Sequence, residues 1–180
     1  ETLGLFIYKV IFMKYSAVQP YNDSALAELI NKLDQNEITD FFSDSKNIIH
    51  KRHISNAVLL FTYALNQLDR IPPADERESH VLTGDFYFSE FYSSLASHGE
   101  MNVVHDMVEI SKILSSKKSR QYEDALEVSD SELKYLLFAP LLYLIDNGYV
   151  TSELDNVLGS YIKNIDRSEL AYIINTKGER

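Results

Sequence analysis

Apolar residues recur at spacings of three and four along most of the chain, a pattern that predicts helices rather than strands. Helix starts are predicted where a side chain can bond the free amides of a first turn. Asn22 or Asp23 precedes one apolar repeat, and Ser129, Ser152 and Asp166 each have an acid three residues later. Strand-like alternation is hard to find, and the chain holds only six glycines and four prolines. The predicted fold class is therefore all-α.

The middle of the chain predicts two long helices separated by a turn. Residues 46–68 are predicted as one helix, which Pro72 and Pro73 bring to an end. Asp75 has Glu78 three residues later, so the next helix is predicted to start there.

This second helix is predicted to run to about His98, with Gly99 as its C-terminal stop. A further helix is predicted over residues 101–114. The basic, polar segment SSKKSRQ, residues 115–121, is expected to be a loop or a frayed helix end.

The stretch VLTGDFYFSEFY, residues 81–92, concentrates aromatic residues on the second long helix. At about 100° per residue, one arc of roughly 180° holds Val81, Tyr87, Phe88, Phe91, Tyr92, Leu95 and Ala96. Leu82 and Phe86 lie outside this arc and form a second apolar patch. The helix is therefore expected to be central in the bundle or to face a partner.

Gly84 and Asp85 fall inside the same arc. A glycine in a helix costs about 1 kcal/mol relative to alanine, so Gly84 is interpreted as a close-packing point for another backbone. A carboxylate inside an apolar arc needs hydrogen bonds or a cation, so Asp85 is interpreted as a satisfied buried acid that anchors the helix. A direct chemical role for Asp85 is the alternative.

Composition narrows the classes of function. With 180 residues, 45% of them hydrophobic, the chain can build one sizeable core, and a single domain over residues 1–180 is expected. A net charge of −10 disfavours nucleic acid as a partner. The absence of cysteine excludes a disulfide framework and a thiol nucleophile.

The most apolar run, residues 3–15, is interrupted by Lys9 and Lys14 and is shorter than the roughly 20 residues that span a bilayer. We expect no membrane span and a cytoplasmic location.

Candidate chemistry is sparse. His50 and His53 are spaced as a pair of metal ligands on one helix face, but no third ligand is near in sequence, and a solvated helix face is the simpler interpretation. The chain has no serine elbow and no glycine-rich phosphate loop. We predict no catalytic residue, no metal site and no cofactor bound by this chain itself.

One family resemblance emerges from the order of these features. The apolar helix NAVLLFTYALNQLD, a short break, and then VLTGDFYFSEFYSSLASHG resemble the first half of the all-α trans-prenyltransferases. Within that superfamily the chain is most similar to component 1, the small noncatalytic subunit of two-component heptaprenyl or hexaprenyl diphosphate synthases. The likeness covers residues 55–114 and implies an isoprenoid-synthase-like helical bundle, reduced in size.

The departures from this family pattern are informative. Catalytic members hold magnesium and the allylic diphosphate with a DDxxD motif, because paired carboxylates supply several oxygens to hard cations. Here Asp69 stands alone at that place, and Ile71, Pro72 and Pro73 follow it. At the place of the second motif the late apolar segment carries Asp146 alone.

The resemblance therefore implies a regulatory subunit that is inactive by itself. It would form a heterodimer with a catalytic DDxxD-bearing prenyltransferase subunit, on which magnesium is expected, and would help set the length of the polyprenyl diphosphate product. The implied pathway is the biosynthesis of the menaquinone side chain. Products of six and of seven isoprene units remain equally open.

The resemblance also suggests a surface. Tyr87, Phe88, Phe91 and Tyr92 are candidates to face the partner or to wall the product tunnel, because bulky side chains can limit the length of a growing hydrocarbon. The alternative for each is a place in this chain's own core.

Two other functions stay open. The chain could be a helical protein-interaction adaptor with no role in isoprenoid synthesis. A weaker alternative is a degenerate terpene-type enzyme that uses Asp69, Asp75 and Glu76 around one magnesium ion.

Overall fold

The protein is described by a computed structural model for residues 21–124 and 127–173. Over these residues the chain forms seven α-helices and two 3-10 helices without a sheet, which confirms the all-α prediction. The helices are α2 (Asp23–Ile30), α3 (Glu37–Ser43), η1 (Ser45–Asn47), α4 (Arg52–Asp69), α5 (Arg77–Ser97), α6 (Met101–Asp124), α7 (Asp130–Asp146), α8 (Glu153–Asn164) and η2 (Arg167–Glu169). None of the helices in this part of the chain is both long and apolar enough to cross a membrane. The apolar run at residues 3–15 lies outside the described residues.

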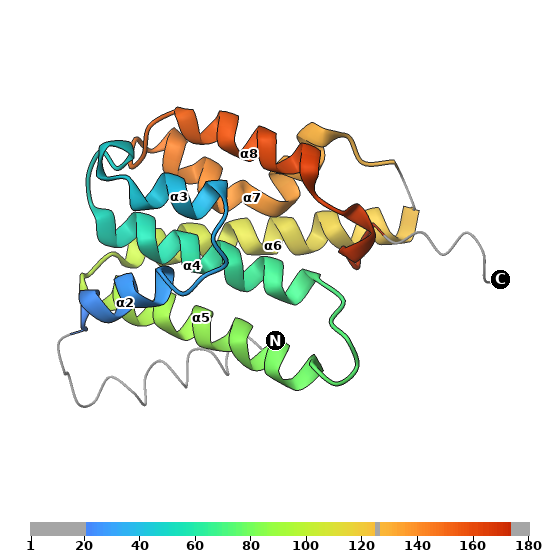
Figure 1. The fold of residues 1–180 in the computed structure, drawn as a ribbon, viewed down its shortest axis with the longest axis horizontal. Coiled ribbons are helices and arrows are strands. Elements are labelled where there is room, and N and C mark those ends of the chain that lie inside the picture. The colour runs from blue at the N-terminus through green and yellow to red at the C-terminus, as the bar shows by residue number, and fades with distance from the viewer. Residues whose placement is uncertain (1–20, 125–126, 174–180) are drawn as a thin grey trace.

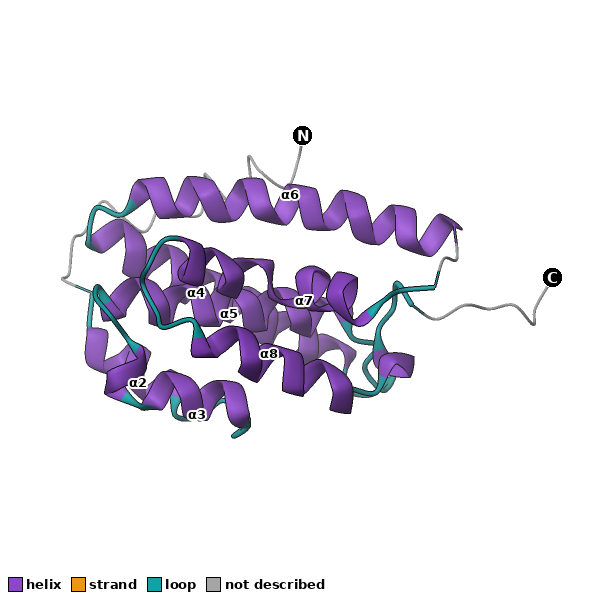
Figure 2. Ribbon diagram, turned by 90° about the horizontal axis from the view of Figure 1, so that it is seen from above, coloured by secondary structure: helices purple, strands orange, loops and turns teal. Residues whose placement is uncertain are grey.

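The helices pack around α4 and α7. Figure 1 shows α4 crossing the middle of the bundle, with α5 along one edge and α8 along the opposite edge. The view from above in Figure 2 places α6 along one side and α2 and α3 on the other. The edge position of α5 leaves one side of that helix without a neighbouring described helix. Of the two expectations for α5, a central place is therefore wrong, and a side that faces a partner stays a prediction.

The two inner helices are buried almost all round, as their composition requires. In α4 every residue from 54 to 62 is buried. In α7 all six residues from 136 to 141 are buried, and the helix is kinked at Phe138 (φ −129°, ψ 16°), two residues before Pro140. The kink follows from the proline ring, which removes an amide donor and crowds the preceding turn.

Two of the predicted helix starts are capped as expected. The side chain of Asn22 accepts a hydrogen bond from the Ser24 amide at the start of α2. Ser129 and Glu132 form a reciprocal capping box at the start of α7. Both confirm that local side chain to backbone bonds fix where these helices begin.

The other predicted starts were placed less well. Ser152 precedes α8 but makes no capping bond with its side chain, and α5 begins at Arg77 after an uncapped Glu76. Asp166 accepts a bond from the Ser168 amide but heads only the three-residue helix η2.

The predicted helix over residues 46–68 was wrong at its start. The short helix η1 ends at Asn47, and the next residues run extended alongside the segment that follows α7. The Ile49 amide donates to the Tyr149 carbonyl at 2.9 Å, and the Thr151 amide donates to the Asn47 carbonyl at 2.9 Å. Because residues 47–49 pair with this distant segment, α4 begins only at Arg52. Contacts between residues a hundred positions apart leave no local pattern in the sequence, so the prediction missed this later start.

The basic segment at residues 115–121, expected to be a loop or a frayed helix end, is helical throughout. It completes α6, which extends to Asp124. Leu114 and Lys118, one turn apart, are both buried against the bundle. Tertiary contact thus stabilises a segment whose polar composition favours a loop.

Candidate functional site

The inner side of α5 packs against α4. Phe91 and Leu95 are fully buried, and the ring centroid of Phe91 lies 4.5 Å from that of Phe61 on α4. Gly84 is buried on the same side. A Cβ atom at Gly84 would lie 3.2 Å from Leu68 Cδ2 and 3.7 Å from the Ala64 carbonyl oxygen.

Asp85 is exposed, so its interpretation as a buried acid was wrong. The buried side of α5 is centred on Phe91, and a residue six positions earlier lies roughly 120° around the helix from it. Gly84, seven positions earlier, is within about 20° of Phe91. The apolar arc of the sequence was therefore rotated relative to the side that the bundle covers, and the carboxylate of Asp85 projects into solvent.

The four aromatic candidates separate into two groups. Phe91, with no exposed surface, belongs to the core and cannot face a partner or a tunnel, which corrects that prediction. Tyr87, Phe88 and Tyr92 are half-buried at the margin of the core. Burial raises the pKa of Tyr92, and it is the main cause of the raised pKa of Tyr87.

The end of α4, the turn after it and the first half of α5 expose several large apolar side chains. Five of the nine large exposed hydrophobic residues in the described part of the chain lie near the turn that joins these helices. They are Leu68 (44% exposed), Ile71 (53%), Val81 (49%), Leu82 (60%) and Phe86 (50%), here called the hairpin-end surface. Exposed apolar residues this near one another in the chain make this surface a candidate for contact with a partner.

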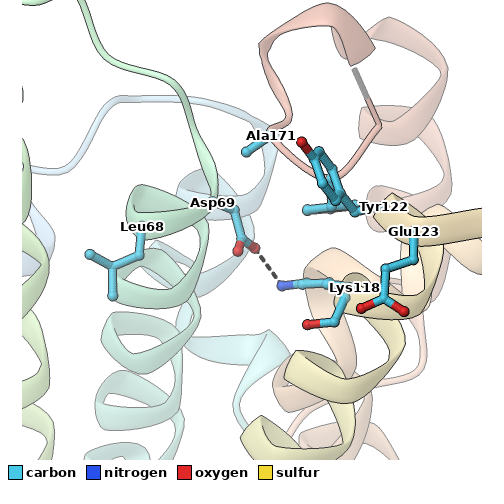
Figure 3. Close-up of a pocket in the computed structure, with 8 residues that line it drawn as sticks. Leu68, Asp69, Lys118, Tyr122, Glu123 and Ala171 are labelled. Atoms are coloured by element: carbon cyan, nitrogen blue, oxygen red, sulfur yellow. Dashed lines mark hydrogen bonds and ion pairs between the residues drawn. The ribbon is translucent and has the colours of Figure 1, made fainter. Parts of the chain in front are cut away.

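Asp69, which the sequence resemblance aligns with the metal motif of catalytic prenyltransferases, forms an ion pair with Lys118 of α6 (Figure 3). Only 19% of the Asp69 side chain and 11% of the Lys118 side chain are exposed. Burial raises the pKa of Asp69, although the Lys118 ammonium opposes this effect. The pair joins the end of α4 to the second half of α6.

A segment near the C-terminal end of the described chain closes over this ion pair. The Ala171 amide donates to the Asp69 carbonyl at 3.0 Å, and the Ile71 amide donates to the Glu169 carbonyl at 3.3 Å. The Lys118 ammonium lies 5.3 Å from the ring centroid of Tyr172. Burial, and secondarily the Asp69 carboxylate, raise the pKa of the Tyr172 hydroxyl.

A cavity of about 350 Å³ adjoins these residues. Leu68, Tyr122 and Glu123 also line it, and Figure 3 shows the Asp69 and Lys118 side chains pointing toward each other beside it. Each charge of the pair is already neutralised by the other, so the Asp69 carboxylate has a cation partner within the chain.

The remaining candidate groups do not assemble into a metal site. His50 precedes α4, so it shares no helix face with His53; its ring packs on Tyr149, whereas His53 stacks on His98 with centroids 4.2 Å apart. Over residues 21–124 and 127–173, no three His, Cys, Asp or Glu side chains lie where they could hold one ion.

Sequence reasoning missed Lys118 and Tyr172. Lys118 belonged to a segment predicted as a loop or a frayed helix end, and Tyr172 lies near the end of the described residues without a motif. The spacing of Leu114 and Lys118 on a continued α6 was the one available signal, because a lysine stem can take an apolar helix position while its ammonium meets an acid.

No model of a known family, no curated protein and no solved structure matches this chain.

Proposed function

We propose that this protein is the noncatalytic, regulatory subunit of a heterodimeric medium-chain trans-polyprenyl diphosphate synthase. In this proposal a separate DDxxD-bearing subunit carries magnesium and performs the condensation. This chain completes the active dimer and contributes to product length.

The hairpin-end surface is the observation that carries this proposal. It exposes Leu82 and Phe86 at 60% and 50% on the helix that bears the family-like stretch LTGDFYFSEFY. A partner that covers these side chains would gain about 25 cal/mol of favourable free energy for each Å² of apolar surface removed from water. The pairing of Asp69 with Lys118 supports a noncatalytic role, because the one acid at the motif position already has a cation.

Reconstitution tests the proposal. The purified chain should show no synthase activity with isopentenyl and farnesyl diphosphates and magnesium, and activity should appear when the DDxxD-bearing partner is added. Robust activity of the chain alone would refute the proposal, as would an unrelated protein as the stoichiometric partner in cell extracts, which supports the adaptor function.

Paired substitutions locate the interface. L82E combined with F86E should weaken binding to the catalytic subunit at least about tenfold, because charges would be buried in an apolar contact. The matched control is I49E combined with I113E, two hydrophobic residues of similar exposure, 56% and 47%, away from the hairpin end. Equal loss in both double variants would contradict a role for this surface.

The same assay addresses chain length. Tyr87, Phe88 and Tyr92 remain the candidates for a tunnel wall, and truncation of a residue that lines the tunnel to alanine should shift the product distribution toward longer chains. Unchanged product lengths in all three variants, with intact assembly, would place the limit elsewhere.

A further inference from the structure

The second half of α6 separates two different environments. Lys118 turns inward to Asp69. Lys117 and Arg120 project from the other side of the same helix into a second cavity, of about 340 Å³, between α6 and the first turns of α7. We call this cavity the α6–α7 pocket; its lining from α7 includes Ser131, Glu132, Tyr135 and Leu136.

Neither cation of the pocket forms a close ion pair. Among the described residues neither Lys117 nor Arg120 has an acid within 4.0 Å of its charged nitrogens. The Lys117 ammonium instead lies 5.6 Å from the ring centroid of Tyr135. Two cations without a close ion pair thus share one pocket on a chain whose net charge is −10.

The one acid of the pocket, Glu132, is hydrogen-bonded to the first turn of α7. Glu132 accepts hydrogen bonds from the Ser129 amide at 3.1 Å and from the Ser129 hydroxyl at 2.8 Å. The bond from the Ser129 amide is the main cause that lowers the pKa of Glu132. The Lys117 ammonium contributes to this lowering, so the carboxylate both closes the first turn of α7 and offsets part of the positive charge. Two cations against one carboxylate leave the pocket with a net positive charge for a ligand.

The walls of the pocket combine this charge with apolar surface. Leu136 is 6% exposed and forms an apolar wall, and Tyr135 is half-buried beside it. A guanidinium and an ammonium together match the oxygens of a phosphoryl group, because arginine binds two of them at once and lysine adds a point charge. The neighbouring tyrosine and leucine suit a flat or apolar substituent.

We propose that the α6–α7 pocket binds a phosphate monoester, with Lys117 and Arg120 holding the phosphoryl oxygens, Ser131 offering a hydroxyl donor, and the organic group lying against Tyr135 and Leu136. This site is separate from the hairpin-end surface, and the inference does not depend on the proposed synthase role.

Amide NMR titration of the full chain tests this assignment, with phenyl phosphate and inorganic phosphate as the probes at constant ionic strength. Phenyl phosphate should produce saturable shifts at residues 117–121 and 131–136, with a dissociation constant of about 1 mM or lower. Its affinity should exceed that of inorganic phosphate. Shifts that fail to saturate, or that spread evenly over the lysines of the surface, would overturn the proposal.

Charge-matched double variants provide the control. K117Q combined with R120Q should weaken phenyl phosphate binding by about tenfold or more. K32Q combined with K163Q, which removes two exposed lysines elsewhere, should leave the affinity within about twofold. Equal loss in both, with thermal unfolding unchanged, would show only the effect of net charge and would refute the site.

Discussion

At the residue scale, Asp69 and Lys118 illustrate how a buried ion pair holds two distant parts of a chain together. The two residues are 49 positions apart, and their side chains are 19% and 11% exposed. Taking two charges out of water costs nearly as much free energy as their attraction returns. Loss of one partner is therefore more destabilising than loss of both.

K118M should lower the free energy of unfolding by about 3 kcal/mol at pH 7, because it leaves the Asp69 carboxylate buried without a cation. Burial already raises the native-state pKa of Asp69 above its ordinary value of 3.8, so the folded protein takes up this proton more readily than the unfolded chain. Ionisation of Asp69 therefore costs no folding stability below pH 3.8, and the loss of stability develops as the pH rises through the raised pKa. Without Lys118 that pKa rises further, and the loss of stability should shrink between pH 7 and pH 4.

Urea unfolding at both pH values measures this effect. The double variant D69N/K118M should recover part of the lost stability, whereas K112M, which removes an exposed lysine of the same helix, should leave the midpoint unchanged. A loss for K118M that is the same at both pH values would contradict the proposed linkage.

At the element scale, α5 is a helix with one covered side. Helical periodicity placed Gly84, Phe91 and Leu95 together, and all three are buried. The same apolar arc also included Val81, which is 49% exposed, and Asp85. An arc of about 180° defines the covered side only broadly, and contact with α4 decides its centre.

Gly84 permits a test of this packing. G84A should raise the free energy of unfolding by about 0.5 kcal/mol, since the gain in helix propensity of about 1 kcal/mol exceeds the cost of displacing Leu68. The nearest atom to the new Cβ, Leu68 Cδ2 at 3.2 Å, belongs to a side chain that is 44% exposed and free to turn. G84L should instead destabilise by about 2 kcal/mol or more, because its branches would crowd α4.

G159A on α8 is the matched control for these urea measurements. No atom lies within 4 Å of a Cβ built at Gly159, so this variant should show the full propensity gain. A destabilising G84A would indicate that Leu68 cannot move aside.

At the scale of the whole molecule, one hydrophobic core runs from Leu26 in α2 to Tyr172 after η2. A single connected core predicts one cooperative unit of unfolding. Phe91 lies in it beside Phe61, whereas Phe86 of the same helix is 50% exposed.

F91A should therefore lower the stability of the entire chain by about 3 to 4 kcal/mol, and F86A by less than about 1 kcal/mol. Far-ultraviolet circular dichroism and tyrosine absorbance should report one coincident transition in both variants. Two separated transitions in F91A would divide the chain into independently stable parts.

The sequence by itself determined the all-α class, the start of α2 to within Asn22 or Asp23, the capping box of Ser129 and the end of α4 before Pro72. Each of these depends on bonds and sterics within a few residues. Tertiary structure decided three other features. Pairing with residues 149–151 delayed the start of α4, contact with the bundle extended α6 through residues 115–121, and packing against α4 turned Asp85 to solvent. Each of these features depends on contacts between residues that are far apart in the sequence, and such contacts leave no local sequence pattern.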